Sequence, residues 1–154
     1  MPSDTHNHLV QKAERWLRSQ GCGVVFSELV AATHNGESPD AIGWREGYVS
    51  MLVECKASRS DFLRDRGKIF RINGNGMGDW RFYLCPPGVI EVEDLPEGWG
   101  LLHLHGNSIL KVYGVPPNTA WASPNHMPFS GNKTCEMVMM YSALRRAQAK
   151  GRAA

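Results

Sequence analysis

The chain has 154 residues, a formal net charge of +2 and 42% hydrophobic residues, a composition typical of one globular domain with a real core. No apolar run is long enough to span a bilayer, and the first residues lack the pattern of a signal peptide, so we expect a cytoplasmic protein with no membrane partner. The four cysteines are widely spaced without a C-x-x-C pair, which argues against zinc and redox motifs and predicts reduced, mostly buried thiols.

The first two predicted elements each carry a glutamate of interest. Residues 6–20 have apolar side chains at helical spacing and predict an amphipathic helix, capped by the aspartate or threonine just before it. Glu14 lies on the rim of its apolar side, where a carboxylate is usually solvated. Residues 23–31 predict a strand, with Glu28 on a face that otherwise looks buried. Because a buried carboxylate needs a partner, Glu28 is the better candidate for a functional site.

The next predicted strands, 40–44 and 48–57, are joined by a short turn. Alternation of side chains in the second strand places Glu54 and Lys56 on one face, at the end of a strand that is otherwise apolar on both faces. Charges at such a place are costly unless they pair or hold a metal. An antiparallel pairing of the two strands would bring Asp40 near Glu54. A plain surface ion pair between Glu54 and Lys56 is the simpler alternative.

Two carboxylates beside a lysine favour phosphoryl chemistry. Asp40 and Glu54 would form a hard oxygen site for Mg²⁺ or Mn²⁺, with the carbonyl of Cys55 as a possible third ligand. Such a metal polarises the phosphoryl oxygen and lowers the pKa of a bound water. Lys56 would orient that water or stabilise charge in the transition state.

The order of these residues resembles the signature of the PD-(D/E)XK nuclease superfamily, in which Pro39-Asp40 is followed by Glu54-Cys55-Lys56. A wider set is similar to MmcB-like putative DNA-repair proteins and related phage proteins: Ser27–Leu29, Pro39–Ala41, Val53–Phe62, Asp65–Arg66, Arg81–Gly88 and Leu95–Leu102. The resemblance covers roughly 10–114. It implies DNA as the substrate, a role in repair or phage DNA metabolism, and a catalytic place for Glu28. It also makes Glu14 an accessory candidate, because many members carry an acidic residue on the first helix.

Residues 59–72 predict a helix with one basic side, directly after the Glu54–Lys56 element. Basic clusters are the usual electrostatic footprint of a protein that binds a phosphate backbone, although a solvated helix face has the same composition. The DNA-binding candidates are Ser58, Arg59, Arg64, Arg66, Lys68 and Arg71. A second basic cluster follows at the C-terminus, where DNA binding and a solvated tail are equally compatible with the sequence: Arg145, Arg146, Lys150 and Arg152.

The rest of the chain predicts a strand at 80–85, a hairpin at 101–113, a long irregular connection at 115–133 and a final helix at 134–149. Met137, Met140, Tyr141 and Leu144 form an apolar stripe on this last helix. Such a stripe usually packs in the core, and it could also form the contact of a homodimer.

Together these elements predict an α/β, restriction-endonuclease-like fold: a mixed central sheet flanked by helices, with a C-terminal helical appendage. Residues 1–114 would form the nuclease-like core, and residues 115–154 the connection and a helix packed on or near it. The first functional hypothesis is a metal-dependent nuclease that hydrolyses DNA phosphodiester bonds. The alternatives are a DNA- or protein-binding module that uses the same fold without cutting, and an interaction protein whose function depends on the final helix.

Overall fold

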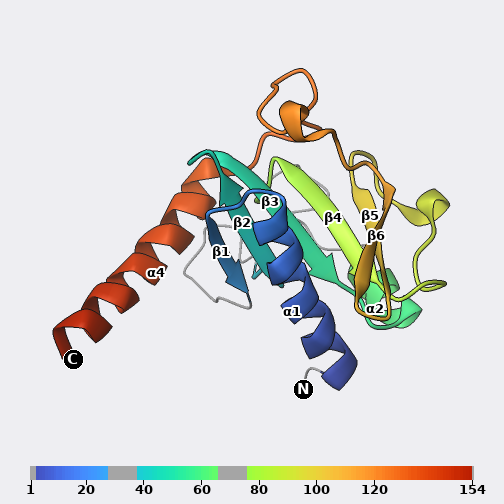
Figure 1. Cartoon of the computed structure of the whole chain (residues 1–154), viewed down its shortest axis with the longest axis horizontal. Helices are drawn as coiled ribbons and strands as arrows, with labels where there is room; N and C mark the ends of the chain where they lie inside the picture. Colours follow the sequence, from blue (N-terminus) through green and yellow to red (C-terminus); the bar gives the residue numbers. More distant parts are fainter. Residues whose placement is uncertain (1–2, 28–37, 66–75, 154) are drawn as a thin grey trace.

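The computed structural model describes residues 3–27, 38–65 and 76–153. Figure 1 shows one twisted sheet with helices packed around it. In chain order the elements are α1 (Asp4–Ser19), β1 (Val24–Ser27), β2 (Ala41–Arg45), β3 (Val49–Cys55), α2 (Arg59–Asp65), β4 (Trp80–Cys85), the 3₁₀ turn η1 (Val92–Asp94), β5 (Gly100–His105), β6 (Ser108–Tyr113), the 3₁₀ turn η2 (Asn118–Ala120) and α4 (Lys133–Ala153).

The six strands form a mixed sheet in the order of the sequence, β1-β2-β3-β4-β5-β6. β1, β2 and β3 pair antiparallel, β4 runs parallel to both β3 and β5, and β6 returns antiparallel to β5. The predicted α/β class, with a mixed central sheet, flanking helices and a C-terminal helix, is confirmed. None of the helices within the described ranges combines the length and the apolar character needed to cross a membrane.

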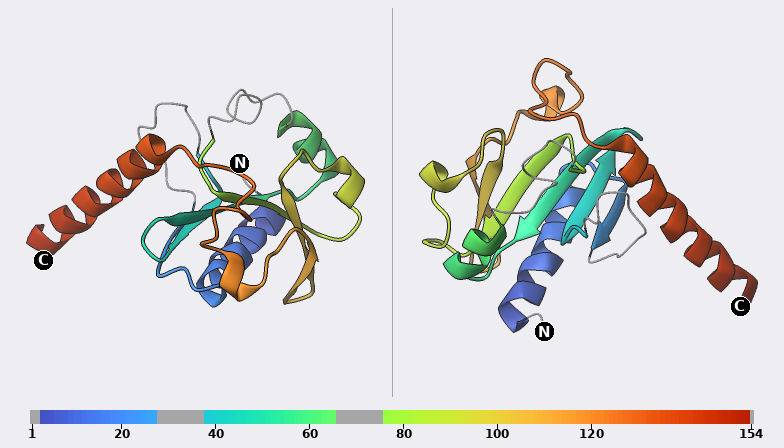
Figure 2. Two further views of the ribbon diagram at one scale, coloured as in Figure 1. Left: turned by 90° about the horizontal axis from the view of Figure 1, so that it is seen from above. Right: turned by 180° about the vertical axis from the view of Figure 1, so that it is seen from behind.

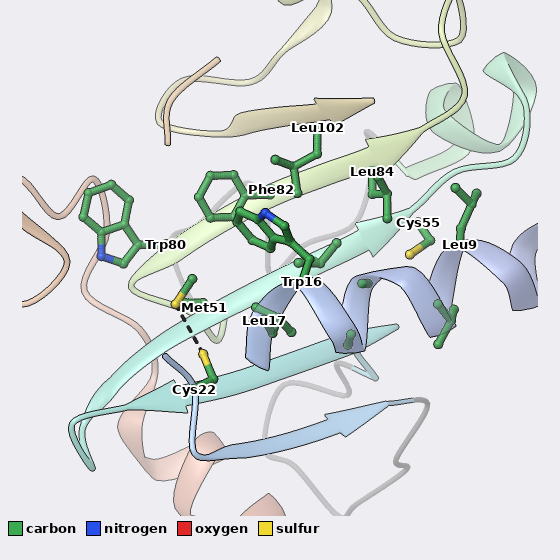
Figure 3. Close-up of a cluster of buried hydrophobic side chains, with 14 of the residues drawn as sticks. Leu9, Trp16, Leu17, Cys22, Met51, Cys55, Trp80, Phe82, Leu84 and Leu102 are labelled. Atoms are coloured by element: carbon green, nitrogen blue, oxygen red, sulfur yellow. Dashed lines mark hydrogen bonds between the residues drawn. The ribbon is translucent and has the colours of Figure 1, made fainter. Parts of the chain in front are cut away.

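Helix α1 covers one face of the sheet, because its apolar residues recur at helical spacing and all point inward. Leu9, Ala13, Trp16 and Leu17 are buried, as their spacing predicts. Figure 3 shows this side of α1 lying over β2 and β3, with the ring of Trp16 against Phe82 of β4. The helix begins earlier than predicted, since the hydroxyl of Ser3, and neither Asp4 nor Thr5, accepts the capping hydrogen bond.

All seven residues of β3 are buried, as expected for a central strand covered on both faces. Met51, Val53 and Cys55 face α1, whereas Leu52 belongs to the second core cluster. In that cluster the ring of Tyr83 stacks on Trp99, with 4.4 Å between ring centroids. All four cysteines are free and buried, which confirms the expectation for the thiols.

The connection between β6 and α4 contributes to the core despite its irregular sequence. Trp121 is fully buried, and its ring meets that of Trp80 edge to face with 5.0 Å between centroids. The indole nitrogen of Trp80 donates to the carbonyl of Trp121 at 3.0 Å. The segment is therefore bound to the sheet through its own tryptophan.

Helix α4 is fixed at its first turn by a polar network, which we call the anchor network. Its members are the buried Ser50, Asp79 and Glu136 and the half-exposed Lys133. Glu136 is 2% exposed, and its carboxylate accepts from the Ser50 hydroxyl at 2.7 Å and from the Trp44 indole nitrogen at 3.0 Å. Asp79 accepts from the backbone nitrogen of Ser50 at 2.9 Å. The ammonium of Lys133 lies between the two carboxylates, at 2.7 Å from Asp79 and 3.1 Å from Glu136.

Most of the predicted apolar stripe of α4 does not pack in the core. Met137, Tyr141 and Leu144 are 65%, 60% and 60% exposed, whereas Met140 is partly buried and packs against the second core cluster. Cys135 and Met139 are the residues of α4 that enter the core. The anchor network decides this rotation of the helix, because Glu136 must face the sheet to reach its partners. Beyond this first part α4 extends away from the sheet, as both views in Figure 2 show.

We expect the Glu136→Ala substitution to lower the free energy of unfolding by about 3 kcal/mol, because it leaves the buried donors of Trp44, Ser50 and Gly78 without their shared acceptor. Urea unfolding followed by tryptophan fluorescence measures this change. The neighbouring Met137→Ala substitution removes an exposed side chain and serves as the control, with an expected change within about 0.5 kcal/mol. Equal effects of the two substitutions would contradict the anchoring role of Glu136.

Candidate functional site

A pocket of about 550 Å³ lies at the carboxyl end of β3, beside the first turn of α1 and the helix α2. Among the described residues its lining is almost entirely polar: Ser3, His6, Ser38, Asp40, Glu54, Cys55, Lys56, Asp61, Arg64 and Asp65. Three residues that the sequence predicted to act together, Asp40, Glu54 and Lys56, are thus present in one pocket.

Asp40 is held in place by the backbone of the neighbouring strand. The pairing of Ala41 with Val53 brings the residue before β2 alongside the end of β3. There the Oδ2 atom of Asp40 accepts a hydrogen bond from the backbone nitrogen of Cys55 at 2.8 Å. The predicted approach of Asp40 to the end of β3 therefore occurs, and one hydrogen bond fixes the orientation of its carboxylate.

The other carboxylate oxygen of Asp40 faces α1. Its Oδ1 atom lies 3.4 Å from Nε2 of His6, whose side chain is 21% exposed. The Ser3 cap sets the start of the helix and so places His6 in its first turn, over the pocket. Sequence reasoning missed His6, because a polar residue in a first helical turn is usually solvated.

Lys56 is bound to a carboxylate that was not among the predicted site residues. Its Nζ atom lies 3.3 Å from Oδ1 of Asp65, whose side chain is fully buried. The hydroxyl of Tyr83 donates to Oδ2 of the same carboxylate at 2.7 Å. Glu54 and Lys56 are both buried, at 4% and 9% exposure. The signal for Asp65 was its position three residues after Phe62, on the apolar side of α2.

The other candidates of the described region lie at the border of the pocket or outside it. Glu14 accepts from the Ser27 hydroxyl at 2.6 Å and pairs with Arg18, and it is not part of the lining. Arg59 forms two hydrogen bonds with the carboxylate of Asp94, at 2.8 and 2.9 Å, and this carboxylate raises the pKa of the guanidinium.

The two remaining candidates of the described region are the residue that caps α2 and a residue within this helix. Ser58 accepts from the backbone nitrogen of Asp61 at 3.3 Å and so caps this helix. Arg64 lines the pocket and pairs with Asp61 one turn earlier. The catalytic candidate Glu28 and the DNA-binding candidates Arg66, Lys68 and Arg71 lie outside the described residues.

The donor set at this pocket fits a hard divalent cation only with help from backbone and water. In the parts of the chain that the structure describes, no three His, Cys, Asp or Glu side chains form a ready metal-binding group. Of the four carboxylates that line the pocket among the described residues, Asp65 pairs with Lys56 and Asp61 with Arg64, which leaves Asp40 and Glu54 as candidate ligands beside the backbone of Cys55. Mg²⁺ is commonly held by one or two carboxylates and keeps several waters, so this set meets its requirements.

Comparisons with known proteins show the fold and no activity. No family model matches the chain, and no curated protein matches it. A solved protein of unknown function from Silicibacter pomeroyi is similar over 97% of this chain and 92% of its own, with a TM-score of 0.64 and 24% sequence identity. This similarity extends over almost the whole chain, so the described arrangement of helices and strands is shared by another natural protein.

We expect the Asp65→Ala substitution to destabilise the fold by about 3 kcal/mol, because it leaves the buried ammonium of Lys56 without its carboxylate. Asp61→Ala is the matched control on the same helix. Its carboxylate is 38% exposed and pairs with an exposed arginine, so we expect a loss below about 1 kcal/mol. Urea unfolding of both variants measures this difference. A similar loss of stability in both would contradict a stabilising role of the buried Lys56–Asp65 pair.

Proposed function

We propose that the protein is a metal-dependent nuclease that hydrolyses phosphodiester bonds of DNA. The observation that carries the proposal is the convergence of Asp40, Glu54 and Lys56 in one polar pocket, with Asp40 fixed by the backbone of Cys55. The resemblance of Pro39–Asp40 and Glu54–Lys56 to the PD-(D/E)XK signature supports the same function. It also suggests the setting, which would be DNA repair or phage DNA metabolism.

The central residues of the pocket have assigned parts in this proposal. Asp40 and Glu54 would hold Mg²⁺ or Mn²⁺ together with the carbonyl of Cys55, and Glu28, which lies outside the described residues, remains the candidate for a further carboxylate. When bound, the metal supplies charge stabilisation and a water of lowered pKa. Lys56, oriented by Asp65, places its ammonium where it can hold the attacking water or the phosphate oxygens.

The surrounding basic residues would contact the phosphate backbone. In this proposal Arg64 and Ser58 would contact the scissile phosphate, and Arg66, Lys68 and Arg71, which lie outside the described residues, remain further candidates for contacts with DNA. Arg59 could contact DNA only after breaking the two hydrogen bonds that its guanidinium donates to the carboxylate of Asp94.

The second candidate function is a DNA-binding module that does not cut. It is favoured by one observation, the ion pair that binds the ammonium of Lys56 to the buried Asp65. A lysine used in this way can serve the fold alone, and the pocket would then recognise a phosphate without activating water.

We expect Mg²⁺- or Mn²⁺-dependent cleavage of labelled duplex, nicked, branched or single-stranded DNA. Asp40→Ala and Lys56→Ala should each reduce the rate by about 10²-fold or more, because each removes a charge that acts in the transition state. Glu14→Ala serves as the control, since Glu14 does not line the pocket.

The same variants separate the two functions. Binding of DNA without cutting by the wild-type protein, in either metal, would leave the non-cleaving module as the function. Cutting that persists in Asp40→Ala would reject the assigned pocket.

A further prediction concerns His6, which we expect to orient Asp40 for metal binding. Partners that orient a ligating group typically contribute 10- to 100-fold to metal affinity. His6→Ala should therefore weaken Mn²⁺ binding about 10-fold in calorimetric titration. His8→Ala is the control, because His8 lies on the same helix, is exposed and is not part of the pocket lining. Unchanged or tighter binding in His6→Ala would contradict the role.

A further inference from the structure

The distal part of α4 extends into solvent with a high density of positive charge. Every residue from Leu144 to Arg152 is exposed, and Figures 1 and 2 show this end of the helix away from the sheet. We call residues 144–152 the basic arm. Its charged residues are Arg145, Arg146, Lys150 and Arg152, and no acidic residue follows Glu136 in the sequence.

The charges of the basic arm are not used by the fold. Within the described ranges none of the four basic side chains forms an ion pair, and Arg145 has only the ring of Tyr141 nearby, at 5.8 Å from its centroid. Removing these four charges from the formal net charge of +2 would leave −2. The arm thus carries the positive excess of the protein, whereas the remainder of the chain is slightly acidic.

We propose that the basic arm binds the phosphate backbone of DNA. With a rise of about 1.5 Å per residue, the four positive charges lie within about 10 Å of helix axis. Duplex DNA offers a matching density, about one negative charge per 1.7 Å. A second copy of this chain does not, because its slight negative excess is spread over an entire surface.

Two arginines of the arm also border a hollow on the surface of α4. An open hollow of about 300 Å³ lies along α4, lined among the described residues by Ser142, Arg145, Arg146 and Ala149. In Figure 1 the basic end of α4 and the first turn of α1, which borders the candidate pocket, both lie at the lower edge of the molecule, well apart along its longest axis. A duplex bound at the pocket would have to run along this edge to reach the arm.

This inference rests on the proposed function for the choice of DNA, and its test is independent of cutting. Binding of fluorescent duplex and single-stranded DNA is measured by anisotropy in the presence of a chelator, over a range of salt concentrations. The arm variant replaces Arg145, Arg146, Lys150 and Arg152 by Gln in the full chain. Gln keeps a high helix propensity, so α4 should persist. The matched body variant replaces Lys12, Arg15, Arg18 and Lys111 by Gln, which is the same change of charge.

We expect the arm variant to bind about 10- to 100-fold more weakly near 100 mM salt, with a shallower salt dependence, by about 3 in the log–log slope. The body variant should stay within about twofold of the wild type, since its four residues belong neither to the basic arm nor to the lining of the candidate pocket. Equal losses in both variants, or no loss in the arm variant, would overturn the proposal.

Sedimentation of the same proteins tests whether a second copy of the chain, and not DNA, binds the arm. A wild-type dimer that dissociates in the arm variant, with DNA binding unchanged, would assign the arm to a second copy and overturn the proposal. Tight DNA binding through the arm by a protein that never cuts would instead refute the proposed nuclease and leave this inference standing.

Discussion

Burial of β3 on both faces is the constraint on which the rest of the structure depends. A strand that is covered by α1 on one side and by the second core cluster on the other can carry polar groups only near its ends. At its carboxyl end Glu54 and Lys56 meet Asp40 and Asp65 in the candidate pocket. Near its amino end Ser50 meets Asp79 and Glu136 in the anchor network. The apolar strand β3 thus separates the candidate pocket from the anchor network that fixes the last helix.

Among the described residues, each lysine and arginine at or beside the pocket is already paired with a carboxylate. Lys56 pairs with Asp65, Arg59 with Asp94, and Arg64 with Asp61. A phosphate that approaches these groups must compete with carboxylates already in place, so the pocket region gives limited attraction at a distance. In the proposed scheme long-range attraction comes from the basic arm, whose charges have no such partners among the described residues, and the pocket supplies orientation and chemistry. This division of tasks follows because the fold pairs the basic side chains at the pocket with carboxylates and leaves those of the arm without such partners among the described residues.

Local patterns predicted the elements and the centre of the site, because alternation in a strand and spacing in a helix report directly on buried faces. The faces of β3, the apolar side of α1 and the approach of Asp40 to the end of β3 were all accessible in this way. The contribution of Asp65 was not, since its partners Lys56 and Tyr83 come from separate elements and pairing depends on the tertiary fold. Which side of α4 faces the core could not be predicted for the same reason. Its apolar stripe has the spacing of a core face, but the partners of Glu136 lie far away in the sequence. Trp121 was hidden in a segment whose composition suggests an irregular connection.

The anchor network also has a consequence for the order in which the protein is completed during synthesis. The Ser50 hydroxyl and the Glu136 carboxylate that it reaches are 86 residues apart in the chain. The strands of the sheet are therefore all synthesised before the carboxylate of Glu136 exists. Until then the Ser50 hydroxyl can pair with Asp79, whereas the backbone nitrogen of Gly78, which donates to Glu136, has to be satisfied by water. The sheet can form early, but the hydrogen bonds to Glu136 at this end of β3 form only after the start of α4 has been synthesised.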